Sequence, residues 1–438
     1  MEILGILGII LAILAIIYFS IKGLNTIIGA PLAGLIVILF NSMPVIDSFL
    51  SAENSYLSAL ANFIVSNFAI FLLGSVLAKY MEKSGATVAI ADKILSMIGT
   101  DKPYNIMVAI FIIAAILTYG GVSMFVVCFA LIPLAKPLFK KMNLKWNLVT
   151  IPVFAGMATF TLSMLPGTPA ASNYIPSNAL GTPLTAAPAI GIVSTIVVII
   201  YILFYMKYAL KKSLAKGEVW VEAEAGPTPQ AIENTELPSF VASILPISSL
   251  IVIILLFRNI PNIIVLGLTV AILLCAFLFR KQVGSQISIL NDGAMGSLGT
   301  TITTGSTIAF GALLTLAPAF GVIRDAIINI PGNPLISYAI AIILLSAITG
   351  SSVGAVGIAM ETFAPTYLAM GIAPALLHRI GSIAAGSFGV LPHTGLVITF
   401  NSVTNLNLKS SYKYQFMTVS ISHMIALIIA LIMGSLFY

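Results

Sequence analysis

Long apolar runs without a charged residue recur along this chain, and they constrain its fold more than any other feature. Each run approaches or exceeds the roughly 20 residues that span a bilayer core as an α-helix. The clearest runs are Leu4–Ser20, Gly23–Pro44, Ala186–Met206, Phe240–Phe257 and Met417–Phe437. Open sheet would leave backbone groups unpaired in lipid, and the alternating pattern of a membrane barrel is absent. The runs therefore predict an all-α polytopic membrane protein in a lipid bilayer.

The positions of these runs predict a layout of crossings. In the first half of the chain the predicted crossings are 3–21, 24–44, 59–78, 147–164 with a continuation to 181, and 184–207. In the second half they are 240–257, 261–279, 299–320, 374–390 with a continuation to 407, and 415–437. The stretches 104–139 and 334–370 are too long for one crossing and too interrupted for two. Each has two short apolar arms around a Gly/Ser cluster, which predicts a re-entrant hairpin with its tip near mid-membrane.

Basic residues test this layout, because Lys and Arg concentrate in the cytoplasmic loops of membrane proteins. Of the 20 Lys and Arg, all but Arg258, Arg324 and Arg379 fall on one side of the predicted layout. That side is therefore predicted to be cytoplasmic, and both termini are predicted to lie outside. The net charge of +6 follows from this loop bias, and it does not indicate a nucleic-acid partner.

The segment 208–238 is predicted to be a cytoplasmic connector between two repeats, 1–207 and 239–438. It is rich in Lys and Glu and is broken by Pro and Gly. Leu165-Pro-Gly-Thr168 in the first repeat recurs as Leu391-Pro-His-Thr394 in the second. Each half holds an odd number of crossings, so the repeats must point in opposite directions. Inverted-topology repeats with broken helices, here 147–181 and 374–407, are typical of secondary transporters.

Small and hydroxylated residues at the hairpin tips are the first candidate binding elements. They let the backbone turn inside the membrane, and the helix that begins after each tip offers a positive dipole end to an anion. The candidates are Gly120, Gly121, Ser123, Ser351 and Ser352. The alternative is a packing face, because Gly350-x-x-x-Gly354 also matches a helix-contact motif. Recurrence of the cluster in both halves favours the binding interpretation.

The proline-containing breaks are the second set of candidates. A proline inside a membrane helix frees carbonyls, which is tolerated where the break lines a cavity or is buried in protein. The polar residues expected to face a site between the repeats are Thr168, Ser172, Asn173, His393 and Thr394. The alternative is a kinked structural helix whose Thr and Ser hydroxyls bond within it.

Ionisable residues inside the membrane are functional candidates because they are costly to bury there. Glu361, on the outgoing arm of the second hairpin, is the only acid within a predicted membrane segment. It is the first candidate for carrying a coupled proton, and His393 is the second. The alternative for Glu361 is an interfacial position or one in a water-filled cavity. His378 and Arg379 are predicted to lie near the outer mouth, and His423 is predicted to be a packing residue.

Several stretches of the chain carry a family resemblance, namely Leu73–Gly85, the hairpin 104–141, the break 165–173 and Gly350–Thr404. Together they resemble the gluconate:proton symporter family (GntP family) of the ion-transporter superfamily. The resemblance implies a prokaryotic inner-membrane carboxylate permease, coupled to protons. It also implies a homodimer in which scaffold and transport domains move as an elevator. This chain has Tyr119-Gly-Gly-Val at the first tip, where such permeases have an acid, and this difference moves the expected proton site to Glu361.

The predicted function is a secondary active symporter for a small organic acid, either a gluconate-like hydroxy acid or a short-chain carboxylate, driven by protons. Sodium coupling is the alternative, and it would use oxygen ligands such as Asn173 and Asn401. A channel and an intramembrane hydrolase are more distant alternatives. Gly350-Ser-Ser-Val-Gly354 fits a hydrolase nucleophile elbow, but that motif requires a preceding strand. No enzymatic activity, cofactor or metal site is predicted.

Overall fold

The computed structural model describes residues 2–86, 89–90, 93, 96–97, 102–119, 124–168, 170–225, 237–257, 260 and 263–437. These residues form helices joined by turns, and none of them lies in a strand. Five of their helices are long and apolar enough to cross a membrane, and a sixth span results if the bent pair α15 (Gln286–Leu316) and α16 (Pro318–Ile328) counts as one. The all-α membrane architecture expected from the sequence is confirmed.

The first half begins with α1 (Glu2–Ile21), α2 (Thr26–Phe40), the short α3 (Val45–Leu50) and the long α4 (Tyr56–Lys83). A hairpin of α6 (Pro103–Tyr119) and α7 (Met124–Lys141) follows. The next helix is broken into η1 (Trp146–Val149), α8 (Thr150–Met157), α9 (Phe160–Ser163) and α10 (Ala171–Leu180). The half ends with α11 (Pro188–Ala215), which runs into the connector, where α12 (Glu222–Ala225) forms one further turn.

The second half repeats this order of elements. It begins with α13 (Phe240–Leu256) and α14 (Ile263–Leu278), followed by the long α15 and by α16. A hairpin of α17 (Pro334–Thr349), α18 (Ser352–Thr362) and α19 (Ala364–Ala369) comes next. A broken helix of α20 (Pro374–Gly386) and α21 (Gly395–Thr404) follows. The last elements are α22 (Leu408–Gln415), the π-helical turn η2 (Phe416–Ser420) and α23 (Ile421–Phe437).

The prediction for 299–320 was wrong in both its bounds. α15 begins at Gln286, and it ends before Pro318, because proline disfavours helical geometry in the residue before it and starts the new helix α16 at an angle of 77°. The polar, glycine-rich start of α15 reads as a loop, but its small residues let α4 approach closely. A Cβ atom on Gly293 would lie 2.6 Å from the Cα atom of Val76. Small residues at such contacts are how membrane helices pack without large side chains.

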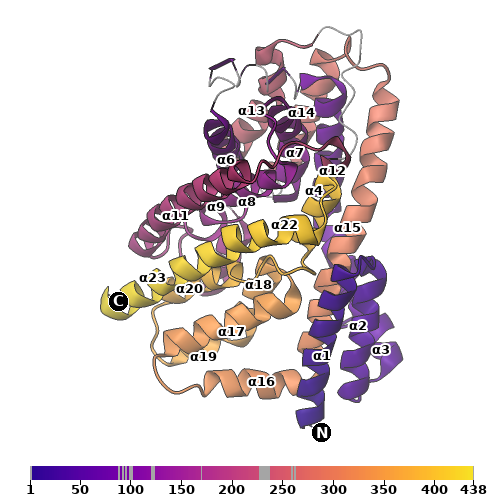
Figure 1. The fold of residues 1–438 in the computed structure, drawn as a ribbon. Coiled ribbons are helices and arrows are strands. Elements are labelled where there is room, and N and C mark those ends of the chain that lie inside the picture. The colour runs from indigo at the N-terminus through magenta and orange to yellow at the C-terminus, as the bar shows by residue number, and fades with distance from the viewer. Residues whose placement is uncertain are drawn as a thin grey trace.

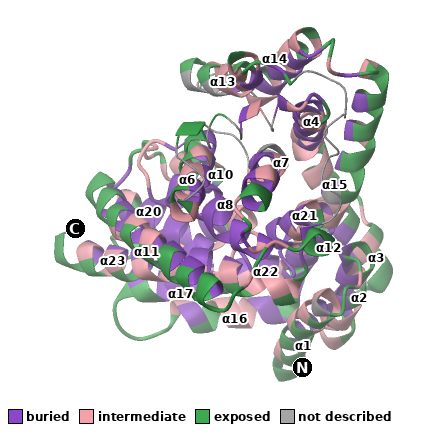
Figure 2. Cartoon of the chain, turned by 45° about the horizontal axis from the view of Figure 1, so that its top comes forward, coloured by how far each residue is buried: buried purple, intermediate pink, exposed green. Residues whose placement is uncertain are grey.

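The helices fall into two groups. In Figure 1, α1–α4 and α15 of the first group lie beside the second group, whereas α13 and α14 lie above α6 and α7, and α16 lies below α17 and α19. The first group, called the wall below, comprises α1–α4 and α13–α16, with α4 packed along α15. The second group, called the block, comprises α6–α11 and α17–α23 and holds both hairpins and both broken helices. Of the residues in Trp146–Ser163, 94% are buried, against 28% in the most apolar window of Tyr56–Lys83. Figure 2 shows the buried residues gathered around α8 and α20, so the block holds the packed centre of the protein.

Candidate functional site

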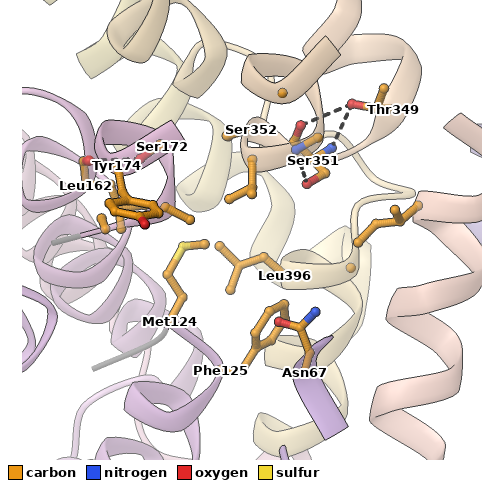
Figure 3. A pocket seen from close by; sticks show the side chains of 18 of the residues that line it. Asn67, Met124, Phe125, Leu162, Ser172, Tyr174, Thr349, Ser351, Ser352 and Leu396 are labelled. Atoms are coloured by element: carbon orange, nitrogen blue, oxygen red, sulfur yellow. Dashed lines mark hydrogen bonds between the residues drawn. The ribbon is translucent and has the colours of Figure 1, made fainter. Parts of the chain in front are cut away.

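A cavity of about 1300 Å³ lies between the wall and the block. Side chains from α4, both hairpins and both broken helices line it, and they converge on one space in Figure 3. α14, α15 and the turn before α23 complete the lining. The cavity therefore joins the two kinds of element, tips and breaks, that the sequence singled out.

The first turns of three helices line this cavity. They belong to α10 (Ala171, Ser172), α18 (Ser352, Val353, Gly354) and α21 (Gly395, Leu396), and Met124 and Phe125 of α7 also line it. The N–H groups of a helix's first turn have no partner within the helix, and the helix dipole makes this end positive. Such an end is a ready site for an anion. Thr349, the last residue of α17, also lines the cavity, so the second hairpin presents a negative helix end as well.

The tip of the second hairpin is held in one shape by local hydrogen bonds. Gly350 adopts a left-handed conformation, with φ of +60°, which glycine adopts without strain. The Ser351 side chain accepts a hydrogen bond of 3.1 Å from the Gly354 N–H and so caps α18. The Thr349 hydroxyl donates to the Ser351 carbonyl at 3.0 Å (Figure 3). A Cβ atom on Gly350 would meet Thr307 at 2.9 Å and His393 at 3.1 Å, so no larger residue fits here.

The first break is closed by side-chain bonds to its own backbone. The Thr168 hydroxyl donates to the Thr161 carbonyl at 2.7 Å, and the Ser172 hydroxyl donates to the Leu162 carbonyl at 2.8 Å. Asn173 Nδ2 donates to the carbonyls of Thr168 and Leu184 at 2.8 and 2.9 Å. Thr168 and Asn173 are fully buried and do not line the cavity, whereas Ser172 does. Thr168 and Asn173 therefore stabilise the break from its buried side and do not face the cavity.

The prediction that His378 and Arg379 lie at the outer mouth was wrong, because both side chains have no exposed surface. His378 Nε2 and Asn173 Oδ1 share a hydrogen bond of 2.8 Å, and His378 Nδ1 shares one of 2.7 Å with the Thr182 hydroxyl. Arg379 Nη1 donates to Asn173 Oδ1 at 3.2 Å. Polar partners supplied by the first break make this burial possible, and a hydropathy pattern carries no information on such partners.

The second break places His393 and Thr394 under the hairpin tip. Both are fully buried and neither lines the cavity. The ring nitrogens of His393 and the hydroxyl of Thr394 make no hydrogen bond of ordinary geometry with the described part of the chain. The His393 ring lies against Gly350, which separates it from the cavity.

The residues proposed for ion coupling differ in whether they face the cavity. Glu361 is exposed to the cavity that it lines, which matches the water-cavity alternative. The longer α15 also contains an acid, Asp292, which is exposed and does not line the cavity. Asn401 Oδ1 accepts from Ser411 at 2.7 Å and from Gln415 at 3.1 Å. Asn401 also does not line the cavity.

Gly120, Gly121 and Ser123 lie outside the described residues, although their neighbours Thr118 and Met124 line the cavity. Of the other binding candidates, the cavity brings together Ser172, Ser351 and Ser352. Ser352 packs closely on the second break: a Cβ atom on Gly389 would clash with the Ser352 hydroxyl.

The sequence interpretation missed a polar face of α4 on the opposite side of the cavity. It comprises Asn62, Ser66 and Asn67. Asn62 and Ser66 are four residues apart, which places them on one face of a helix, and Asn67 borders that face. Polar residues gathered in this way in an apolar run were a usable signal. Asn67 points into the cavity beside Phe125 in Figure 3. His423 is hydrogen-bonded to Ser163 and to the Val419 carbonyl, so it packs as predicted, but it also lines the cavity.

The profile of the GntP family permeases matches residues 1–290. The chain belongs to the GntP permease family. It is 30% identical over 446 residues to the uncharacterized transporter YxjC of Bacillus subtilis (strain 168), with 92% of this chain and 93% of that protein covered. The crystal structure of the Alcanivorax borkumensis YdaH transporter is similar at 15% identity and a TM-score of 0.47, covering 86% of this chain and 87% of that one. Membership in this family makes the chain a membrane transporter rather than an enzyme.

Proposed function

We propose that this GntP-family transporter is a proton-coupled symporter for a small organic acid, which binds in the cavity between the hairpins and the breaks. The observation that carries the proposal is the set of helix N-termini of α10, α18 and α21 lining one cavity. The N–H groups of these first turns that no cap satisfies, and the positive ends of the helix dipoles, stabilise a carboxylate without a charged side chain in contact with it. Ser172 and Ser352, which line the same cavity, supply hydroxyls for a hydroxy acid.

The two halves act as inverted repeats in this proposal. Their matching order of a long helix, a hairpin, a broken helix and a final long helix supports it. In transporters of this type the discontinuous helices meet near the membrane midplane. The proposal includes two re-entrant hairpins, a location in the inner membrane and termini that lie outside.

Transport then proceeds as an elevator, with the wall as scaffold and the block as the moving part. The cavity supports this division, because α4 lines one side and the tips and breaks line the other. An anion bound to the tips would move with the block past the polar face of α4. A homodimer, formed through the wall, would keep the scaffold stationary.

Glu361 is the proposed proton carrier. It is the one carboxylate among the described residues that line the cavity, so its charge acts directly on a bound anion. Protonation removes a like charge from the cavity and favours entry of the anion, which couples the two movements. The sodium alternative has less support, because Asn173 and Asn401 lie away from the cavity with their side-chain oxygens already accepting hydrogen bonds. Arg379 lies 3.2 Å from the Asn173 oxygen and would repel a cation there.

Proteoliposomes test the function. Wild-type protein should accumulate labelled gluconate, lactate or butyrate under an imposed pH gradient and not under a sodium gradient alone. Glu361→Gln mimics the protonated state, so it should exchange the acid across the membrane but not accumulate it. Accumulation by the Gln variant at the wild-type level would remove Glu361 from the mechanism and make His393 the next candidate.

A further inference from the structure

Arg379 is a buried cation that the function described so far does not use. Its guanidinium donates to the Ala186 carbonyl from Nε and Nη2 at 3.1 and 2.9 Å. It donates to the Ser163 carbonyl from Nη1 at 2.9 Å and to the Leu184 carbonyl from Nη2 at 3.4 Å. With Asn173, these partners come from both sides of the first break.

None of the partners of Arg379 is a carboxylate. Within the ranges that the structure describes, it forms no ion pair. Carbonyl and amide oxygens satisfy its donors, but they leave its full positive charge in place. A buried charge is expensive to keep without an opposite charge, so its retention here calls for a compensating anion.

The cavity is where that anion would lie. Ser163 and Leu184, whose carbonyls bind the guanidinium, both line the cavity, as does Ser382 one turn further along α20. No Lys or Arg occurs among the described residues that line it, and Glu361 is their one formal charge. At the first break, a single layer of residues therefore separates the Arg379 guanidinium from the cavity. Charges separated by protein interact more strongly than charges separated by water.

We propose that Arg379 is the fixed positive charge of the cavity, which selects anionic substrates from behind the first break. This inference rests on the proposed function. Arg379 is a positioning and specificity-determining residue, since it acts through the break and does not itself line the cavity. α18, which carries Glu361, packs against both α10 and α20. The substrate carboxylate and the Glu361 carboxylate therefore compete for the same positive charge, and the substrate gains most when Glu361 is protonated.

A charge placed in the cavity tests the inference without touching Arg379. Leu184 is partly exposed and lines the cavity, so Leu184→Glu and Leu184→Gln differ there by one negative charge at constant shape. The Glu variant should bind labelled gluconate, lactate or butyrate at least about tenfold more weakly than the Gln variant, because its carboxylate neutralises Arg379. Equal affinities of the two variants would overturn the inference.

Variants of Arg379 give a second, independent reading. Arg379→Lys keeps the charge and loses the fork of donors, whereas Arg379→Gln keeps donors and loses the charge. The Lys variant should retain more substrate affinity than the Gln variant, and Lys211→Gln, which removes an exposed charge on α11, should bind as the wild type does. A Lys variant that is folded but no better than the Gln variant would assign Arg379 a structural role only. Failure of the wild type to take up any of the three acids would instead overturn the proposed function.

Discussion

The two breaks share a sequence pattern, but they differ in how their polar groups are satisfied. In the first break, Thr168 and Asn173 bond to backbone carbonyls, and Asn173 also accepts from His378 and Arg379. In the second break, the side chains of His393 and Thr394 are equally buried, yet these side chains make no hydrogen bond of ordinary geometry with the described chain.

This difference predicts that the first break is more rigid than the second. A fully satisfied buried network rigidifies its surroundings, whereas buried polar groups without partners raise the energy of the state that holds them. We infer that the first break keeps the cavity in shape. The second break is packed under the tip at Gly350, so a movement of the hairpin would act on it directly.

The largest expected effect comes from removing the centre of the first network. Asn173→Ala leaves donors of His378 and Arg379 and two carbonyls without this partner. It should lower the free energy of unfolding by about 2–4 kcal/mol, since each unsatisfied buried group costs about 1–3 kcal/mol. Thermal unfolding in detergent measures this. An unchanged midpoint would mean that the first break is no more rigid than the second.

Next in size is the tip above the second break. Gly350→Ala should cost about 1–3 kcal/mol, because a left-handed conformation is strained for alanine and its Cβ would press on Thr307 and His393. Gly357 in the same hairpin is a matched control, since it is helical and a Cβ there has nothing within 4 Å. Gly357→Ala should be stabilising by about 0.5–1 kcal/mol. Equal effects of both changes on thermal unfolding would contradict the tight packing of the tip.

A smaller effect compares the breaks directly by the same substitution at matching positions. Thr168→Val removes a bonded hydroxyl and should cost about 1 kcal/mol, whereas Thr394→Val removes a hydroxyl without a partner and should be neutral or stabilising. A destabilised Thr394→Val protein would show that this hydroxyl has a bonding partner after all.

The smallest effect concerns the ion pair at the start of the first broken helix. Burial raises the pKa of Glu218, but hydrogen bonds from Ser213 and Lys145 outweigh it and hold that pKa below its ordinary value. A lowered pKa contributes stability above the unfolded pKa, and this is lost as the pH falls through the folded value. Since Lys145 and Glu218 lie 3.1 Å apart and are partly exposed, the contribution should be under about 1 kcal/mol. Glu218→Gln should lower the free energy of unfolding at pH 7–8 by that amount and leave it unchanged below the folded pKa, so the acid limb of a stability profile becomes flatter.

Much of the fold could be predicted because it depends on properties of single segments. Apolar runs demand helices in lipid whatever their neighbours are, and Gly350 and Pro318 mark turns by their own backbone limits. The start of α15 at Gln286 could not be predicted, because its small and polar residues are explained only by the surface of α4 that covers them.

The sequence by itself determined that this chain is a helical membrane protein with hairpins and broken helices, and it pointed to both tips and both breaks. Only the tertiary structure decided which polar side chains face the cavity. Ser172 and Asn173 are adjacent in sequence, yet one lines the cavity and the other binds Arg379 behind it. The reason is physical: a residue's polarity belongs to the residue, but its hydrogen-bond partners come from distant segments that only packing brings together.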